Sequence, residues 1–205
     1  MVRTVDTLRV AIDHLAGREP AFAALVERHG PPEPRSSEPG AHTLLRTIVG
    51  QQVSVAAARS MWAKLETAYG SPPNLRAILR ASDEELRLAG LSRQKAGYAR
   101  SLADLVLTGQ LDLDNLPAND EEAIELLTRI KGIGRWSAEI YLLFAEGRPD
   151  VWPAGDLAVQ ISVGRLLGLD GKPTEKSLRE LAEPWRPHRG AAAILAWHDY
   201  NSAVL

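Results

Sequence analysis

The sequence predicts an all-α protein. Apolar residues recur at helical spacing along most of the 205 residues, and no segment alternates convincingly at the period of two that is typical of strands. Segments open repeatedly with helix-capping residues, as in Ser82–Glu85, whose sequence SDEE is a capping box. A Gly/Pro/Ser-rich stretch at residues 30–40 is the clearest boundary. This length accommodates one compact domain or two small lobes that share a cleft.

Two short helices are expected within residues 1–29. Thr4 or Asp6 can cap the first, and Pro20 suits the first turn of the second. The side chains that these helices should bury are Leu8, Ile12, Leu15, Phe22 and Leu25.

After the linker, Thr43 is expected to cap a helix that Gly50 interrupts, and Ser54 to cap the next one. The segment between them forms a tight junction that presents the side-chain amides of Gln51 and Gln52 outward. The remaining helices are expected at residues 82–90, 92–107, 119–130, 135–145, from 156 onward, 175–182 and 190–202.

Composition excludes several kinds of chemistry. The absence of cysteine rules out disulfides, thiolate catalysis, iron–sulfur clusters and the common structural zinc sites. The five histidines show no metal-ligand spacing, so a transition-metal enzyme is not expected. No cofactor is expected to be required. A net charge of −2 counts against nucleic-acid binding, although a local basic patch can carry phosphate contacts.

The sequence also bears on location. No apolar run approaches the roughly 18 residues that span a bilayer, and charges interrupt the N-terminal segment where a signal peptide would be apolar. We therefore expect a cytoplasmic protein with no membrane partner, active on the nucleoid if the source is bacterial.

The most specific local feature is a helix, the turn Lys131-Gly132-Ile133-Gly134, and a second helix. Two glycines around one apolar residue permit a tight turn, and the following helix start presents backbone N–H groups that favour an anion such as a DNA phosphate. Ile133 would pack between the helices, and Lys131 and Arg135 add positive charge. The alternative is a plain αα-hairpin whose glycines only end one helix and begin the next.

Two segments together resemble a known family. The sequence LLTRIKGIGRWSAEIYLLFA at residues 126–145, followed by VWPAGDLAVQ at residues 151–160, resembles the helix-hairpin-helix DNA glycosylase superfamily, with its Gly/Pro-rich loop and essential aspartate. In that pattern the hairpin binds the DNA backbone and Asp156 faces the sugar of an extruded nucleotide. The resemblance extends over about residues 42–201.

The chemistry of a carboxylate at this place is consistent with that role. Cleavage of a glycosidic bond produces an oxocarbenium-like sugar, whose charge a carboxylate stabilises or whose attacking water it activates. A helix N-terminus favours the ionised form of Asp156. The alternative is that Asp156 serves only as a helix N-cap, which is the commonest role for aspartate there.

The resemblance also indicates which branch of the superfamily the sequence is most similar to. Family members that cut the DNA strand carry a lysine in a GxGxK pattern, where this chain has Trp136. With the iron–sulfur branch excluded by the lack of cysteine, the sequence resembles the monofunctional 3-methyladenine DNA glycosylase II branch. Longer bacterial relatives carry an additional N-terminal α/β domain, for which this chain has no room.

Three further segments agree with that branch. The sequence IVGQQVS at residues 48–54 resembles the part that enters DNA at the lesion, so Gln51 or Gln52 would fill the gap left by the flipped base or wedge the strand apart. Two exposed glutamines at a helix junction are the alternative. The second segment is GLSRQK at residues 90–95, in which Ser92 is expected to cap a helix and Lys95 to contact a phosphate.

The third segment is WRPHRGAAAILAW at residues 185–197. Arg186 or Arg189 would contact DNA or orient the catalytic loop, while Trp185 and Pro187 can simply pack the last helices together.

Aromatic side chains supply a candidate pocket. An alkylated purine is positively charged, so electron-rich rings attract it. Trp136 is the first candidate wall, with Trp197 and Tyr141 behind it. The charged base is already a good leaving group, so no general acid is required and one aspartate suffices. Tryptophans are more often core residues than pocket walls, and that alternative stands for Tyr141 and Trp197.

The resemblance implies two helical lobes with a cleft between them: residues 42–150, with the helix-hairpin-helix, and residues 1–41 with 151–205, carrying Asp156. We expect a monomer that excises alkylated purines from duplex DNA in base excision repair, without AP lyase activity. The hairpin carbonyls would suit a monovalent cation. The alternatives are a non-catalytic module that binds damaged or distorted DNA, and a glycosylase for deaminated or mismatched bases.

Overall fold

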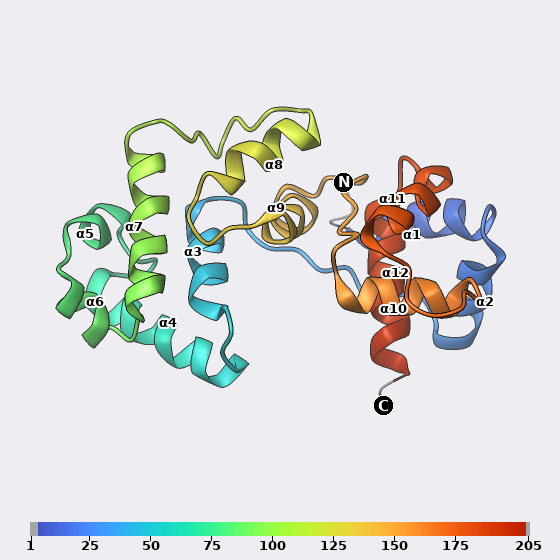
Figure 1. The fold of residues 1–205 in the computed structure, drawn as a ribbon, viewed down its shortest axis with the longest axis horizontal. Helices are drawn as coiled ribbons and strands as arrows, with labels where there is room; N and C mark the ends of the chain where they lie inside the picture. Colours follow the sequence, from blue (N-terminus) through green and yellow to red (C-terminus); the bar gives the residue numbers. More distant parts are fainter. Residues whose placement is uncertain (1–3, 204–205) are drawn as a thin grey trace. The chain divides into compact units, whose positions relative to one another are not determined.

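The computed structural model describes residues 4–203, and all regular elements in that range are helical (Figure 1). The chain divides into a central unit, Glu38–Tyr141, and a terminal unit, Met1–Ser37 with Leu142–Leu205. The sequence placed the second boundary at 150, but residues 142–150 cluster with the terminal unit. No helix among the described residues is long and apolar enough to cross a membrane.

The central unit is built on α3 (Ala41–Gly50) and α7 (Arg93–Leu107), which contact each other. Around them lie α4 (Val55–Tyr69), α5 (Leu75–Arg80), α6 (Asp83–Leu88), α8 (Asp120–Thr128) and α9 (Arg135–Tyr141). Helix α7 also contacts α5 and α6, and α3 also contacts α4 and α9. The fully buried core includes Leu44, Leu45, Ile48, Leu65, Ile78, Leu102 and Leu127.

The terminal unit is built on α12 (Arg189–Ser202), which contacts α1 (Val5–Ala16), α2 (Pro20–His29) and α10 (Leu157–Leu166). Its other elements are the π-helix η1 (Leu142–Glu146), α11 (Glu175–Leu181) and the 3-10 turn η2 (Glu183–Trp185). The buried face of α12 carries three consecutive alanines, residues 191–193, which let neighbouring helices approach closely. Trp185 packs against Phe22 and Trp152, with ring centroids 5.0 and 5.5 Å away.

The predicted caps are mostly confirmed. Thr4, rather than Asp6, caps α1 in a capping box, and the other confirmed caps are Ser54, Ser82 and Ser92. The prediction for Thr43 is wrong: α3 begins after Gly40, and the Thr43 hydroxyl donates to the Glu38 carbonyl at 2.6 Å.

Two segments differ from the predicted pattern. The helix expected at 135–145 ends as an α-helix at Tyr141 and continues as η1. Helix α5 was missed, because six residues capped by Asn74 are too short to show a clear periodicity. The linker at 30–40 contains no helix before residue 41, and the Ser37 N–H donates to the Phe144 carbonyl at 2.9 Å.

Candidate active site

Asp156 is the N-cap of α10. Its carboxylate Oδ1 accepts hydrogen bonds from the backbone N–H of Val159 at 3.0 Å and from the indole Nε1–H of Trp197 at 3.1 Å. The side chain is half-buried. The capping role that sequence analysis gave as the alternative is therefore real, and it also holds the carboxylate in one position.

The loop that precedes Asp156 is anchored from inside the unit. Gln160, on the first turn of α10, is buried and donates from Nε2 to the Ala154 carbonyl at 2.7 Å. Its Oε1 accepts from Lys172 Nζ at 2.7 Å. On the other side, Trp152 Nε1 donates to the Leu178 carbonyl at 3.2 Å. These contacts fix the backbone that delivers the acid.

Arg189 also acts on this loop. Its guanidinium, with only 12% of the side chain exposed, pairs with Asp150 at 2.9 Å and with Glu183 at 3.1 Å. Arg186 pairs with the same two carboxylates. Of the two roles considered for these arginines, the ion pairs favour orientation of the loop over a direct DNA contact.

Trp197 is held by a buried polar contact between α10 and α12. Asp199, two residues further along α12, is 4% exposed and accepts from the Ser162 hydroxyl at 2.7 Å. Arg165 of α10 pairs with the same carboxylate oxygen. Because these bonds fix the register of α12 on α10, they support the hydrogen bond from Trp197 to Asp156.

The Trp197 ring also lines a hollow of about 360 Å³ in the terminal unit. Phe144 lies on it, with ring centroids 5.6 Å apart. The linker prolines Pro31 and Pro32 form another part of the wall. The rings of Phe144 and Trp197 therefore face an open space, and the Trp197 indole N–H also donates to Asp156.

In the central unit, Gly132 and Gly134 have different roles in the turn. Gly132 has φ +85°, and a Cβ built on it would lie 2.1 Å from the Tyr98 ring, so only glycine fits. A Cβ on Gly134 would meet open space, and its φ is ordinary. Ile133 is buried, as predicted, and the Lys131 N–H donates to Ser101 Oγ at 3.1 Å.

The two glutamines also separate. Gln51 Nε2 donates to the Gly132 carbonyl at 2.7 Å, so this side chain braces the turn. Gln52 is exposed and has φ +54°, a left-handed conformation that is strained for a residue with a side chain. Gln52 is therefore the one that projects outward.

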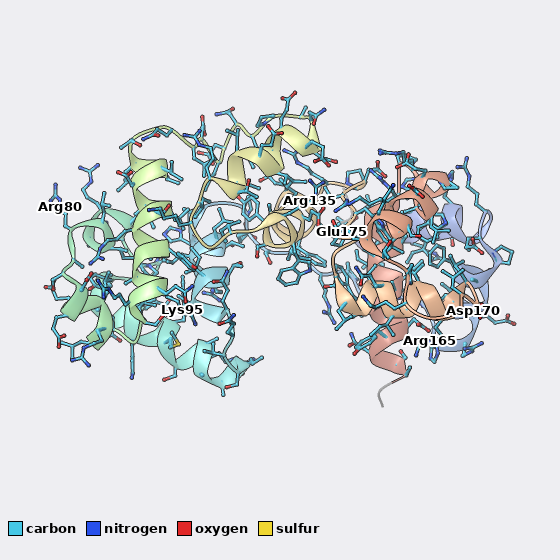
Figure 2. All side chains as sticks on the ribbon, viewed as in Figure 1. Arg80, Lys95, Arg135, Arg165, Asp170 and Glu175 are labelled. Carbon is cyan, nitrogen blue, oxygen red and sulfur yellow. The ribbon has the colours of Figure 1, made fainter. Side chains whose placement is uncertain are left out.

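The cations beside the turn are less available than the sequence indicated. Lys95, on α7 (Figure 2), is 9% exposed and donates from Nζ to the Val49 carbonyl at 2.7 Å, and burial lowers its pKa. Arg135 makes two bonds with Glu121, at 2.8 and 2.5 Å, and one with Glu139 at 3.0 Å. The predicted phosphate contact by Lys95 disagrees with its burial. Lys131 is exposed.

The remaining aromatic candidates lie in the central unit. Trp136 is 47% exposed and lines a hollow of about 650 Å³ that also includes Gln51, Gln52 and Lys95. Tyr141 is 3% exposed, and its hydroxyl accepts from the Gly40 N–H at 2.7 Å. Tyr141 is thus a core residue rather than the pocket wall that sequence analysis expected.

Tyr98, Gln160 and Asp199 were not predicted as functional residues. Each acts by contacting a residue distant in the sequence or a backbone atom. Tyr98 and Asp199 belong to no motif, and Gln160 ends the segment VWPAGDLAVQ, which does not indicate its hydrogen bond to the Ala154 carbonyl. The described residues contain no cluster of three or more histidines or carboxylates that could hold a metal ion.

The fold and site define a class: all-helical proteins in which a glycine turn joins two helices and a carboxylate follows a Pro/Gly loop at the start of another helix. The chain belongs to the HhH-GPD superfamily of base excision DNA repair proteins, whose family model matches residues 45–187.

Two relatives from fission yeast are similar over nearly the whole chain. The chain is 32% identical to DNA-3-methyladenine glycosylase 1 of Schizosaccharomyces pombe, over 98% of this chain and 93% of that one. It is 29% identical to the alkylbase DNA glycosidase-like protein mag2 of the same organism, over 90% of each.

Solved structures show the same similarity. The 3-methyladenine DNA glycosylase of S. pombe in complex with abasic DNA matches with a TM-score of 0.79 and 30% identity, over 95% of this chain and 97% of that chain. A DNA-3-methyladenine glycosidase from Bacillus halodurans matches with a TM-score of 0.81 and 30% identity, over 95% and 90%.

Proposed function

We propose that this chain is a monofunctional DNA glycosylase that hydrolyses the N-glycosidic bond of alkylated purines, of the 3-methyladenine and 7-methylguanine type, in duplex DNA. The observation that carries the proposal is the carboxylate of Asp156, held at a helix start by Val159 and by the Trp197 indole. The related DNA-3-methyladenine glycosylases support the choice of substrate.

The reaction follows from the position of one acid. The damaged nucleotide leaves the base stack, and the bond between C1′ and the purine nitrogen breaks as positive charge develops on the sugar. The Asp156 carboxylate stabilises that charge, and a water adds to C1′ while its proton passes to the carboxylate or to solvent. An alkylated purine departs as a neutral molecule, so no protein acid has to protonate it.

The aromatic rings supply recognition of the charged base. Trp197 contacts the acid directly and lines a hollow with Phe144, so its face suits a cationic purine. Trp136, the other exposed candidate, occupies the place where strand-cutting relatives carry a lysine. Without that amine no Schiff base forms, and the DNA strand stays intact.

The central unit supplies the grip on DNA. The turn at residues 131–134 would bind the backbone through its N–H groups and Lys131, while Gln51 braces it and Gln52 enters the gap left by the flipped base. Arg135 and Arg189 then act through Glu121 and Asp150, as positioning residues.

A monovalent cation at the turn is a further part of the proposal. Two nearby carbonyls are already engaged, because Gly132 accepts from Gln51 and Ile130 accepts from the Ile133 N–H. A carbonyl oxygen has a second lone pair, so the turn remains a suitable donor set. Exchange of Na⁺ and K⁺ for a bulky organic cation at constant ionic strength would weaken DNA binding.

We propose that the protein acts as a cytoplasmic monomer.

The function is tested with duplex DNA that carries radiolabelled methylated purines. We expect release of free 3-methyladenine or 7-methylguanine and a strand that breaks only after alkali treatment. Binding to abasic DNA without base release would instead indicate a non-catalytic module. Release confined to deaminated or mismatched bases would overturn the substrate class, and a strand cut without alkali would overturn the monofunctional assignment.

A further inference from the structure

A second hollow lies beside the segment that carries Gln52. Its volume is about 470 Å³, and its wall includes Arg46, Arg59, Trp62, Val53 and Val55. Gly50 lines both this hollow and the one that contains Gln51, Gln52 and Trp136. The turn at residues 50–53 therefore separates two open spaces, and the proposed function has used only one of them.

The two arginines of this hollow differ from Arg135 and Arg189 in their ion pairs. Arg46 and Arg59 are exposed, and neither guanidinium forms an ion pair with a carboxylate of the described residues. By contrast, Arg135 and Arg189 are tied to acids. Glu66 also lines the hollow, where its Oε1 accepts from the Ser71 hydroxyl at 2.9 Å. The hollow therefore carries two cations that form no ion pair among the described residues, and one carboxylate.

The rest of the wall is apolar. Val53 and Val55 are 39% and 70% exposed. Trp62 forms the floor: it is 7% exposed, and Arg46 lies over its ring with Cζ 4.3 Å from the centroid. Its indole Nε1 has no hydrogen-bond partner among the described residues. Cations above an apolar floor suit a nucleotide, which carries a phosphate on one side and a sugar and base on the other.

We propose that this hollow binds the DNA strand opposite the lesion, with Arg46 and Arg59 on its phosphates and Val53 and Val55 against the unpaired nucleotide. The inference rests on the proposed function. If Gln52 enters the duplex, the hollow on the Trp136 side faces the strand that the glycine turn holds. The hollow on the far side of the 50–53 turn then faces the complementary strand.

As a consequence, the central unit would contact both strands of the duplex. Phosphate contacts on the complementary strand hold it in place while the other strand is distorted, which lowers the cost of keeping the damaged nucleotide outside the stack. The strained backbone at Gln52 is then supported from both sides when DNA is bound.

The test uses a duplex with an abasic-site analogue and single methylphosphonate linkages, which remove one phosphate charge at a time. For the unaltered protein we expect about a tenfold loss of affinity when one or two linkages opposite the lesion are neutral. The Arg46→Gln/Arg59→Gln variant should bind more weakly and should not respond to those linkages. Its log–log slope of affinity against salt should fall by about 2, because two phosphate contacts are lost.

The matched control is Arg80→Gln, which removes the same charge from the outer end of α5 (Figure 2). It should keep both the affinity and the response to the neutral linkages. Arg59→Gln alone tests the proposal without disturbing the stack of Arg46 on Trp62. Arg46→Lys keeps the charge, so it should bind more tightly than Arg46→Gln.

Two outcomes overturn the inference: a double variant that responds to the complementary-strand linkages as fully as the unaltered protein, or a response confined to the lesion strand. Base release is measured on the same variants. If methylated DNA loses its base normally but the linkages have no effect, only the inference fails. If no base is released while the linkage pattern appears, the proposed function fails and the surface stands.

Discussion

Two helix starts, one in each unit, use the same physical feature in opposite ways. Helix α10 begins at Asp156, whose carboxylate already accepts from the Val159 N–H. Helix α9 begins after Gly134, which has no side chain to compete for the N–H groups of the first turn. A helix N-terminus favours negative charge. The comparison teaches that one start fixes the protein's own anion for chemistry, and the other suits an anion from outside.

The turn of the central unit gives the largest expected effect. Gly132→Ala places a Cβ 2.1 Å from the Tyr98 ring at φ +85°, so the turn has to move. We expect affinity for abasic duplex DNA to fall at least about 100-fold and the free energy of unfolding to fall by about 3 kcal/mol. Denaturant unfolding and a binding titration measure the two effects.

Gly134→Ala is the matched control, because a Cβ there meets open space. It should change the unfolding free energy by less than about 1 kcal/mol and weaken DNA binding much less than Gly132→Ala does. Equal losses for the two variants would show that the difference between the glycines has no bearing on binding.

The next effect concerns the terminal unit. Trp197→Phe removes the N–H that Asp156 accepts but keeps an aromatic ring beside Phe144. Because a hydrogen bond to a charged group contributes about 1.5–3 kcal/mol, single-turnover base release should slow about 30-fold. Binding of abasic DNA should not change. A variant as fast as the unaltered protein would remove Trp197 from the account.

A smaller effect is expected where the loop is anchored. Gln160→Leu removes the donor to the Ala154 carbonyl and leaves that acceptor without its partner inside the unit. Base release should slow about tenfold as the acid loses its fixed position. Lys172→Met, which removes only the outer contact to Gln160, should cost less than about twofold. If both variants behave alike, Gln160 has no positioning role.

The smallest effect is a pH dependence of stability. Burial, and then the charge of His14 with its ring centroid 4.8 Å away, lower the pKa of His188 from 6.5; Asp150 opposes this and Arg18 adds to it. The unfolded chain therefore binds a proton at a higher pH than the folded chain. Stability should be fully present above about pH 6.5 and decline as the pH falls toward the lowered pKa.

His188→Gln should flatten this decline in denaturant unfolding measured between pH 7.5 and 5. The control His42→Gln changes an exposed residue at the start of α3 and should leave the decline as it is. A decline that persists unchanged in His188→Gln would assign it to other groups.

Local patterns predicted most of the helices and their caps, because caps and apolar spacing act within a few residues. Ser82, Ser92 and Asp156 cap helices as expected. Thr43 failed because Gly40 starts the helix with no side-chain cap, and its entry is set instead by the Tyr141 hydroxyl, 101 residues away.

The pairing of charges was the part that sequence could not supply. Arg135 and Arg189 look like phosphate ligands in a motif, but Glu121 and Asp150 neutralise them through contacts that only the fold creates. The reverse holds for Arg46 and Arg59, which belong to no motif and lack acidic partners among the described residues. Availability of a cation depends on tertiary neighbours, which spacing along the chain does not encode.

The most direct test of the central claim measures base release and DNA binding side by side for Asp156→Asn. The amide keeps the size of the side chain and an oxygen for the Val159 N–H, but it loses the charge. Release of methylated purines should fall by about 1000-fold, while affinity for abasic duplex DNA stays within about twofold. Base release near the rate of the unaltered protein would contradict the assignment of Asp156 as the catalytic carboxylate.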